Sequence, residues 1–332
     1  MARIAVNIVT YNSADTIEAC LEAVLGQTYS DLEVLVVDNH STDDTAALVK
    51  CWRDRGVRLV VNGRNEFFAR AHNWAIDHTD SEFVLTLNPD VMMYPDYVAR
   101  VVAVLERSPR VAGVNGKLLL IKPNEFSPKA LAAWPEPGRL IDGAGIGMRR
   151  SRRPYLRGNR KRHGECCVAA SPIFGVDAAC GTYRRSMLED IAIDGEYFDN
   201  AFVIYREDVD LAWRAQLLGW DSWFEPAALA YHIRGFHIGR GRRAIDPVLR
   251  RHSVKNGWLL LIKNDDAGAV VRGLPWILPY QLRILIGLLT VERTSLPAVT
   301  DALRLLPRMR RWRRLLRARQ SVPPRKLRHW LE

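Results

Sequence analysis

Short apolar runs alternate with stretches of helical periodicity along the first third of the chain. Runs of apolar residues at 5–10, 34–37, 58–61 and 83–87 have the length and composition of buried strands. Between and after them, apolar residues recur every three or four positions, as in the helix predicted for residues 17–25 and in the one expected to begin at Pro95. Strands that alternate with helices predict βαβ units and a mostly parallel sheet flanked by helices, which is an α/β fold.

The pattern loosens after about residue 115. Residues 122–165 are rich in Pro, Gly and Arg, and a long irregular stretch inside a compact domain is usually functional or disordered. Regular patterns return with a strand predicted at 176–183 and a helix at 208–218, whose apolar residues form one stripe.

The C-terminal region combines an apolar segment with a basic one. Residues 274–289 are strongly apolar, and residues 304–319 carry eight arginines and no acid, interleaved with Leu, Met and Trp. One interpretation is a solvated basic helix. The other is an amphipathic segment on an anionic membrane surface, with Arg in the headgroups and Trp312 and the leucines at the acyl boundary. Pro307 interrupts the pattern, so one continuous helix is not expected. No uninterrupted apolar stretch reaches the ~20 residues that cross a bilayer.

The formal net charge of +11 belongs to this C-terminus. Residues 302–332 hold eleven Lys/Arg and one acid, and the rest of the chain holds 37 basic and 36 acidic groups. Because counterion release needs basic groups where phosphates lie, we expect no nucleic-acid partner for the near-neutral body. The five cysteines show no CxxC spacing, which favours reduced thiols and a cytoplasmic location.

Acidic residues follow two of the predicted strands. Asp38 ends the apolar run 34–37, and Asp90 follows the run 83–87. Ligands of open α/β sheets bind at the carboxyl ends of strands, so Asp38 is placed to bind a nucleotide and Asp90 to bind Mg²⁺ or Mn²⁺. Each also has a structural interpretation, as a helix cap or a turn residue, because residues 41–44 resemble a capping box and Asn-Pro-Asp favours turns.

Glu207 and Asp208 form a third acidic group, at the start of the helix predicted at 208–218. The helix dipole favours acids at this position without any catalytic role. Together with the acids at the two strand ends, however, the pair indicates a metal-assisted transfer site with a separate general base.

The motifs, taken in order, resemble glycosyltransferase family 2 over roughly residues 4–235. They comprise Val9-Thr10-Tyr11-Asn12, Val37-Asp38-Asn39, Asn65-Glu66-Phe67 with Asn73, Asn88-Pro89-Asp90, Gly181-Thr182-Tyr183, Glu207-Asp208-Val209-Asp210 and Glu225-Pro226. Asp142-Gly143-Ala144-Gly145 and the segment 195–199 are similar to the bacterial rhamnosyltransferase-like branch.

Beyond the matching residues, the composition of the C-terminus predicts a helical, basic extension that forms a membrane-association region (241–332). The resemblance implies a GT-A fold, Rossmann-like with a mostly parallel sheet, and divides the rest of the chain into a nucleotide-sugar-binding half (1–115) and an acceptor-binding half (116–240). It also implies inverting sugar transfer, with specificity set by the loops 122–165 and 232–250.

Roles for individual residues follow from the same resemblance. The donor would be held by Thr10, Tyr11, Asn12, Asp38, Asn65, Asn73 and Asn88. Asp90 would bind Mg²⁺ or Mn²⁺ as the last residue of a DxD-like motif, and Asp208, beside Glu207, would be the general base. His232 matches a position that faces the metal or diphosphate in some members; the alternative is a histidine packed beside Tyr231.

The chain departs from the family pattern at three positions. Asn88 replaces the first aspartate of DxD, Glu66 stands where glycine is common, and Arg206 stands where a small residue often precedes the acidic pair. The first departure weakens the expected metal site, and the other two affect the donor and the acceptor.

The resemblance predicts rhamnose transfer from dTDP-rhamnose to a glycan or polyprenyl-linked glycan, in cell-envelope polysaccharide synthesis. The enzyme would be peripheral on the inner face of the cell membrane. A UDP-hexose or UDP-N-acetylhexosamine transferase is one alternative. A non-catalytic, membrane-attached nucleotide-sugar binding module is another, although the presence of both Asp90 and Asp208 disfavours it.

Overall fold

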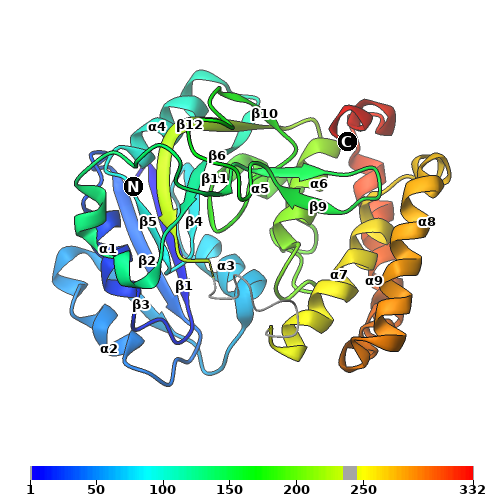
Figure 1. Cartoon of the computed structure of the whole chain (residues 1–332), viewed down its shortest axis with the longest axis horizontal. Coiled ribbons are helices and arrows are strands. Elements are labelled where there is room, and N and C mark those ends of the chain that lie inside the picture. The colour runs from blue at the N-terminus through cyan, green and yellow to red at the C-terminus, as the bar shows by residue number, and fades with distance from the viewer. Residues whose placement is uncertain (1, 235–244, 332) are drawn as a thin grey trace.

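The computed structural model describes residues 2–234 and 245–331, and a mixed ten-stranded sheet forms its centre (Figure 1). The sheet order is β10-β12-β6-β11-β4-β1-β2-β3, with β5 paired to β12 and β7 to β6. The pairs β1–β2, β1–β4, β2–β3 and β6–β12 are parallel. The strands are β1 Ile4–Thr10, β2 Leu32–Asp38, β3 Val57–Val61, β4 Phe83–Leu87, β5 Val91–Met93, β6 Val111–Leu120, β7 Ile141–Gly143, β10 Ser171–Ile173, β11 Cys180–Arg184 and β12 Asp221–His232; β8 Ile146–Met148 and β9 Pro154–Leu156 form a separate hairpin.

Helices cover both faces of the sheet. One face packs against α1, α2 and α4, and the other against α3, α5 and α6. A C-terminal layer of α7, α8 and α9 lies beside α6 (Figure 1). The helices are α1 Ile17–Leu25, α2 Thr45–Lys50, α3 Phe67–Asp77, α4 Tyr97–Arg107, α5 Arg185–Ile191, α6 Glu207–Leu217, α7 Pro247–Asn264, α8 Ala267–Thr290 and α9 Pro297–Arg319, with short 3-10 helices at Arg53–Arg55, Pro123–Glu125, Pro128–Leu131, Arg293–Ser295 and Pro324–Trp330.

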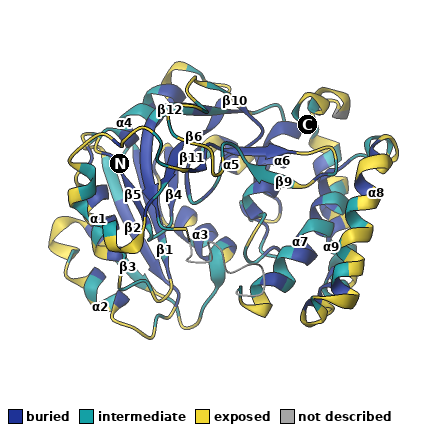
Figure 2. Cartoon of the chain, viewed as in Figure 1, coloured by how far each residue is buried: buried dark blue, intermediate teal, exposed yellow. Residues whose placement is uncertain are grey.

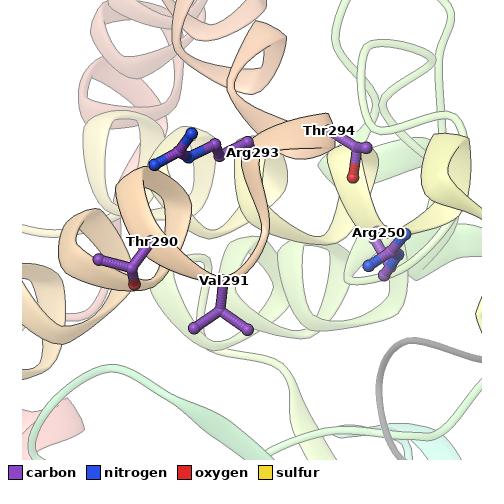
Figure 3. Close-up of a pocket in the computed structure, with 5 residues that line it drawn as sticks. All are labelled: Arg250, Thr290, Val291, Arg293 and Thr294. Carbon is purple, nitrogen blue, oxygen red and sulfur yellow. The ribbon is translucent and has the colours of Figure 1, made fainter.

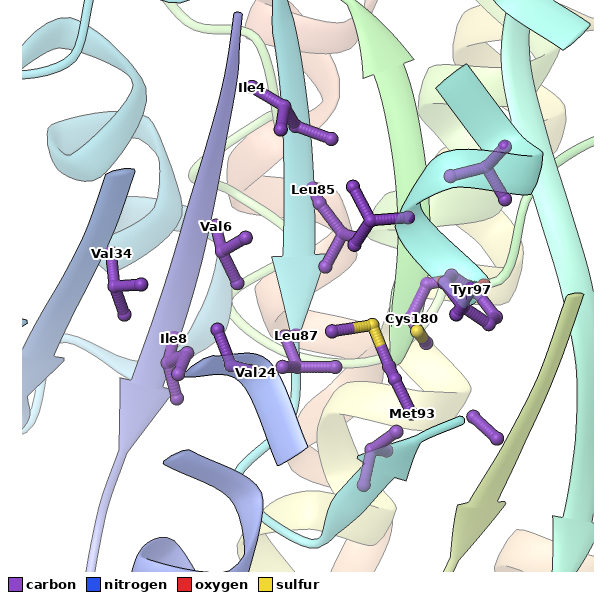
Figure 4. Packing of buried hydrophobic residues seen from close by; sticks show 14 of the residues in the cluster. Ile4, Val6, Ile8, Val24, Val34, Leu85, Leu87, Met93, Tyr97 and Cys180 are labelled. Atoms are coloured by element: carbon purple, nitrogen blue, oxygen red, sulfur yellow. Dashed lines mark hydrogen bonds between the residues drawn. The ribbon is translucent and has the colours of Figure 1, made fainter. Parts of the chain in front are cut away.

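The main core follows from the alternation of side chains along β1 and β4. Ile4, Val6 and Ile8 on β1 lie on the same face of the sheet as Leu85 and Leu87 on β4, and α1 and α4 cover this face (Figure 4). The opposite face of β2 buries Leu35 and Val37 against alanines of α3. Both faces of the parallel strands are therefore covered, which explains their almost continuous apolar sequence.

The α/β fold with a mostly parallel first half is confirmed. The strand 83–87 and the helix 17–25 have the predicted bounds, and the other three predicted strands agree to within two residues, whereas β5 and β6 were not predicted. The first 115 residues share one sheet with the rest of the chain, because β6 runs through residue 115 and pairs with both β11 and β12.

Two local predictions need correction. Residues 41–44 do not form a capping box, since Asp44 makes no side-chain cap and Ser41 instead donates to Asp38. Residues 122–165 contain short strands as well as loops, and β7 extends the main sheet by pairing with β6. The pairing partner of β7 is distant in sequence, so local composition indicated only a loop.

The C-terminal layer differs from its prediction in two ways. Helix α9 runs unbroken through Pro307, which lies on its exposed side, where water can reach the carbonyl that loses its donor. Its apolar stripe of Met309, Trp312 and Leu316 is buried against α6 and α7. The expectation that Trp312 lies at a membrane boundary is therefore wrong.

A buried ionic network joins the C-terminal layer to α6. Lys263 of α7 donates to Asp199 and to Asp210, at 2.8 Å in each case, and all three side chains are fully buried. Arg214 pairs with Asp210, and Arg308 of α9 pairs with Asp199. The layer is thus fixed to the helix that begins with Glu207 and Asp208.

No single helix within residues 2–234 and 245–331 is long and apolar enough to cross a membrane. The pair Ala267–Thr290 and Arg293–Arg319 meets the length and composition criteria together, but the two helices are bent by 110°.

Candidate functional site

The carboxyl ends of β1 and β2 meet through a buried hydrogen bond. Thr10 donates to Asp38 at 2.8 Å, and Ser41 donates to the same carboxylate through its backbone N–H and its hydroxyl. Thr10 and Asp38 are both fully buried. In this geometry Asp38 orders the loop 39–41, and a ligand would reach its carboxylate only after Ser41 turned away.

Tyr11 and Asn12 extend from the same strand end. Tyr11 is 49% exposed, so its ring is accessible for stacking. Asn12 has a left-handed backbone (φ 50°), and its side-chain oxygen accepts from the Thr42 backbone N–H at 2.8 Å. The two loops that follow β1 and β2 therefore brace one another beside an exposed aromatic ring.

The three other asparagines predicted to bind the donor lie in different environments. Asn65 accepts from the backbone N–H of Phe67, which has φ 57°. The amide of Asn73 is occupied inside the protein, donating to the Phe198 carbonyl and accepting from its N–H. Asn88 is half-buried in the turn between β4 and β5. Asn73 therefore connects α3 to the segment before α6 and is not free for a ligand.

Asp90 and His232 face one another. Asp90 follows β4, and His232 ends β12, where it is paired with Val91 of β5. His232 Nε2 lies 3.4 Å from Asp90 Oδ1, and His232 Nδ1 donates to Asp142 Oδ2 at 2.8 Å. Asp142, fully buried on β7, also accepts from Arg234 at 2.8 Å.

The charges in this group account for its protonation. Burial would lower the pKa of His232, but the carboxylates of Asp90 and Asp142 outweigh burial and raise it to about 10. Burial would raise the pKa of Asp90, and the charge of His232 outweighs it and lowers this pKa. With no ion bound, His232 is therefore an imidazolium between two carboxylates.

These residues fit a divalent cation. Asp90 Oδ1 is buried, and apart from the 3.4 Å ion pair with His232 Nε2 it makes no hydrogen bond within the described residues, so an oxygen ligand is available. An ion here would displace the proton on His232 Nε2, while Nδ1–H continues to donate to Asp142, as in carboxylate–histidine–metal arrangements. The described part of the chain offers no group of three His, Cys, Asp or Glu arranged around an ion. Diphosphate oxygens would have to complete the coordination, as is usual for Mg²⁺.

Glu207 and Asp208 begin α6 after a strained turn. Val203, Tyr205 and Arg206 have φ values of 67°, 68° and 69°, a left-handed conformation that residues other than glycine rarely adopt. Such strain typically costs ~1–3 kcal/mol per residue and persists only where the surroundings impose it. The turn sets the direction in which the first residues of α6 point.

The acid pair is accompanied by a third carboxyl, Asp177. Burial, followed by the charge of Asp177, raises the pKa of Asp208 to about 7. Burial and the charge of Asp208 raise the pKa of Glu207 well above its usual range, and its Oε2 has no hydrogen-bond partner in the described structure. Burial and like charge thus favour the protonated form of Glu207, and near neutral pH Asp208 is poised to exchange a proton, which is the property a general base needs.

Helix α7 holds the strained turn in place. The buried amide of Asn256 donates to the carbonyls of Phe202, Ile204 and Tyr205 at 2.7–2.9 Å. The guanidinium of Arg206 lies against the backbone of Gly257, where a Cβ atom would be only 2.3 Å from Arg206 Nη1. The C-terminal layer therefore shapes the loop in front of Asp208.

Sequence reasoning missed Asp177 and Asn256 and gave Asp142 no role. Asp142 lies in a motif that had been noticed, Asp142-Gly143-Ala144-Gly145, and its burial on β7 was the missing information. Asp177 and Asn256 had no sequence signal, because their significance depends on neighbours remote in the chain. The loop 232–250 was predicted to select the substrate. Its residues 235–244 lie outside the described part of the chain.

The family model for glycosyl transferase family 2 matches residues 5–191. The chain is 28% identical over 246 residues to an N-acetylglucosaminyl-diphospho-decaprenol L-rhamnosyltransferase of Mycobacterium tuberculosis, covering 70% of this chain and 76% of that protein. It is 25% identical over 203 residues to the putative glycosyltransferase EpsE of Bacillus subtilis, covering 59% and 66%.

Solved structures share the fold. A mannosyltransferase from Pyrobaculum calidifontis, in complex with GDP-Man and Mn²⁺, superposes with a TM-score of 0.54 at 21% identity, covering 96% of this chain and 86% of that one. TarS of S. aureus gives a TM-score of 0.57 at 18% identity, covering 96% and 52%. At these identities the likeness establishes the architecture alone.

Proposed function

The chain belongs to glycosyltransferase family 2 and has the GT-A fold with a helical C-terminal region, and from this we propose that it is an inverting, metal-dependent transferase. It would move a sugar from a nucleoside-diphosphate donor to a hydroxyl group of a glycan or lipid-linked glycan. The observation that carries the proposal is the partly exposed carboxyl of Asp208, whose pKa is raised to about 7. Asp177, whose charge contributes to this shift, also interacts with Asp142 and His232 of the group that contains Asp90.

Asp208 would act as the general base. It takes the proton of the acceptor hydroxyl as the oxygen attacks the anomeric carbon, and the bond from that carbon to the diphosphate oxygen breaks. A single displacement inverts the configuration and needs no covalent sugar intermediate. A well-placed base contributes ~10²–10⁴-fold. Glu207 beside it, whose protonated form burial favours, would donate a hydrogen bond without taking the proton.

The other residues would bind and orient the donor. Tyr11 would stack on the nucleotide base, with Asn12, Asn65 and Asn88 around it, while Thr10 and Asp38 shape the loop beneath. Asp90 and His232 would hold Mg²⁺ or Mn²⁺, which would neutralise charge on the departing diphosphate. Asp142 would orient His232, and Asn73 is assigned a positioning role because its amide is already engaged.

We also propose that three regions of the chain have the separate functions expected from the sequence. Residues 1–115 would bind the nucleotide sugar, 116–240 the acceptor, and 241–332 a membrane surface. The donor we favour is dTDP-rhamnose, supported by the 28% identity to a protein named an L-rhamnosyltransferase acting on a decaprenol-linked sugar. The cytoplasmic location stays a prediction.

The experiment measures nucleoside-diphosphate release from dTDP-, UDP- and GDP-sugars with Mn²⁺ and a membrane lipid extract, for the native protein and for Asp208→Asn. We expect one donor to be turned over, with kcat reduced ~10²–10⁴-fold in the variant and the donor KM unchanged. Equal turnover by the variant would remove Asp208 from the mechanism. Release only from UDP-hexoses would replace rhamnose as the donor sugar.

A further inference from the structure

Helix α8 leaves an apolar face uncovered. Of its 24 residues only Gly273, Ile277 and Leu288 are buried. Figure 2 shows the helix along the outer edge of the C-terminal layer, largely exposed or intermediate. Its side chains of 41–65% exposure recur at spacings of three and four residues and so form one stripe: Val271, Leu274, Leu278, Leu282, Leu285 and Leu289.

This stripe is too long for an incidental patch. Scattered apolar residues are normal on a protein surface, but a continuous apolar face with a polar rim marks an interaction site. The inner side of α8 is fixed in place, because Trp258 donates to Gln281 and Arg152 donates to the Ala269 carbonyl. The outer face is therefore presented by an anchored helix.

The charges around the stripe point to an anionic partner. Helix α8 contains Arg272 and Arg283 and no acid. The guanidinium of Arg150 lies 5.0 Å from the ring centroid of Trp276, which is 45% exposed. With about 3.6 residues per turn, Trp276 lies with Arg272 and Arg283 at the edge of the exposed side of α8 that is opposite the stripe. Arginine with tryptophan at the edge of an apolar face is typical of helices that lie in a membrane interface.

A hollow lined by basic residues lies at the C-terminal end of α8. At the bend after α8, a hollow of about 440 Å³ is lined by Arg250, Arg293, Thr290, Thr294 and Val291 (Figure 3). Arg250 is buried, and its Nε has no hydrogen-bond partner in the described structure, although Glu292 lies 3.8 Å from Nη1. In Figure 1 this bend lies at the same end of the molecule as the carboxyl ends of β1 and β2.

We propose that the outer face of α8 docks on a bilayer that contains anionic lipid, with α8 lying in the interface. The apolar stripe would enter the acyl boundary, and Arg272, Arg283 and Arg293 would meet lipid phosphates. A second copy of the chain fits less well, since a symmetric pairing would bring arginines together with no acid on α8 to neutralise them. This docking deepens the membrane association proposed above for residues 241–332 by naming the surface, and its presentation of a lipid-linked acceptor to Asp208 rests on the proposed sugar transfer; binding to lipid is measured without that transfer.

The test compares binding to vesicles of phosphatidylcholine alone and with about one-third phosphatidylglycerol, a typical anionic surface. The variant Leu278→Gln/Leu282→Gln/Leu285→Gln should lose about tenfold or more of its vesicle partitioning, because three apolar side chains no longer enter the lipid. The matched control is Leu303→Gln/Leu315→Gln, two exposed leucines of α9, which should bind as the native protein does. Far-UV circular dichroism and Tm check that each variant is folded.

Quenching by brominated lipid gives a second readout. The tryptophan fluorescence of the native protein should be quenched when it binds these vesicles. If the quenching is smaller in Trp276→Phe, the difference shows that the Trp276 side chain reaches the acyl boundary. Unchanged partitioning of the α8 variant, or equal loss in the α9 control, overturns the proposal. Concentration-dependent dimerisation that the α8 variant abolishes, without vesicle binding, would assign the face to a second copy.

These readouts are separate from the reaction. Vesicle binding by native protein that turns over no donor would defeat the proposed function and leave the docking surface standing. Turnover of a soluble donor by native protein that does not bind vesicles would defeat the docking surface and leave the proposed sugar transfer standing.

Discussion

Asp208 owes its character to burial and to a neighbour that sequence inspection does not reveal. An aspartate at a helix N-terminus is ordinarily ionised well below neutral pH. Here burial opposes the charged form and Asp177 adds like-charge repulsion, so the pKa rises to about 7. Asp142 shows the same dependence on surroundings, because His232 and Arg234 hold its pKa low despite full burial.

The pH dependence of kcat tests the state of Asp208. The active base is the carboxylate, so activity should fall as the pH drops through about 7 and level off above it. Removing the repulsion in Asp177→Asn should move the midpoint to lower pH. The measurement is kcat at saturating donor from about pH 5 to 9 for both proteins. A flat native profile over this range contradicts the assignment, and an unshifted midpoint in the variant removes Asp177 from it.

At the scale of elements, the turn before α6 depends on α7 more than on its own residues. Three of the four residues 203–206, namely Val203, Tyr205 and Arg206, adopt a left-handed backbone conformation that the local sequence does not favour. Asn256 satisfies three carbonyls of this turn at once. The C-terminal layer is thus part of the site's support, although none of its described residues is proposed to touch the reacting groups.

Replacing Asn256 by alanine should therefore impair catalysis. With the turn released, Asp208 is misplaced, and a shift of about 1 Å can cost ~10² in rate. We expect kcat to fall to that extent while the donor KM stays unchanged. Asn264→Ala is the matched control, a fully buried asparagine on the same helix that donates to Asp210 and not to the turn. Both variants should lower Tm; a similar loss of kcat in both would mean that the effect is general destabilisation.

At the scale of the whole molecule, buried charge fastens the C-terminal layer to the transferase body. Lys263 lies between Asp199 and Asp210 and over the rings of Phe202 and Trp312. Buried ion pairs contribute little net stability, yet removing one partner leaves uncompensated charge. The layer that carries the proposed membrane face is for this reason rigidly connected to the helix that carries Asp208.

Lys263→Met keeps the length of the side chain and removes its charge. The free energy of unfolding should fall by about 3–5 kcal/mol, because two buried carboxylates lose their shared cation. Denaturant titration at neutral pH measures it. Lys326→Met, at an exposed position, should change stability by less than about 0.5 kcal/mol. A loss from Lys263→Met no larger than this control would show that Arg214 and Arg308 suffice to neutralise the carboxylates.

The sequence by itself determined the regular elements and the family. Strand and helix periods are properties of neighbouring residues, so β1 to β4, α1 and α6 were predictable, and so was the placement of Asp38 and Asp90 after strands. The ordered motifs then identified glycosyltransferase family 2, which the family model confirms.

Only the tertiary structure decided which side chains share an environment. Asp142 and His232 lie 90 residues apart in sequence and 2.8 Å apart in space, and Asp177 acts on Asp208 from another element. The same holds for the C-terminal helices: the amphipathic pattern of α9 showed that it needs an apolar partner, but not that the partner is α6 and α7, leaving α8 exposed. Periodicity is local, whereas burial, and with it the pKa and the free surface, depends on packing between segments distant in the chain.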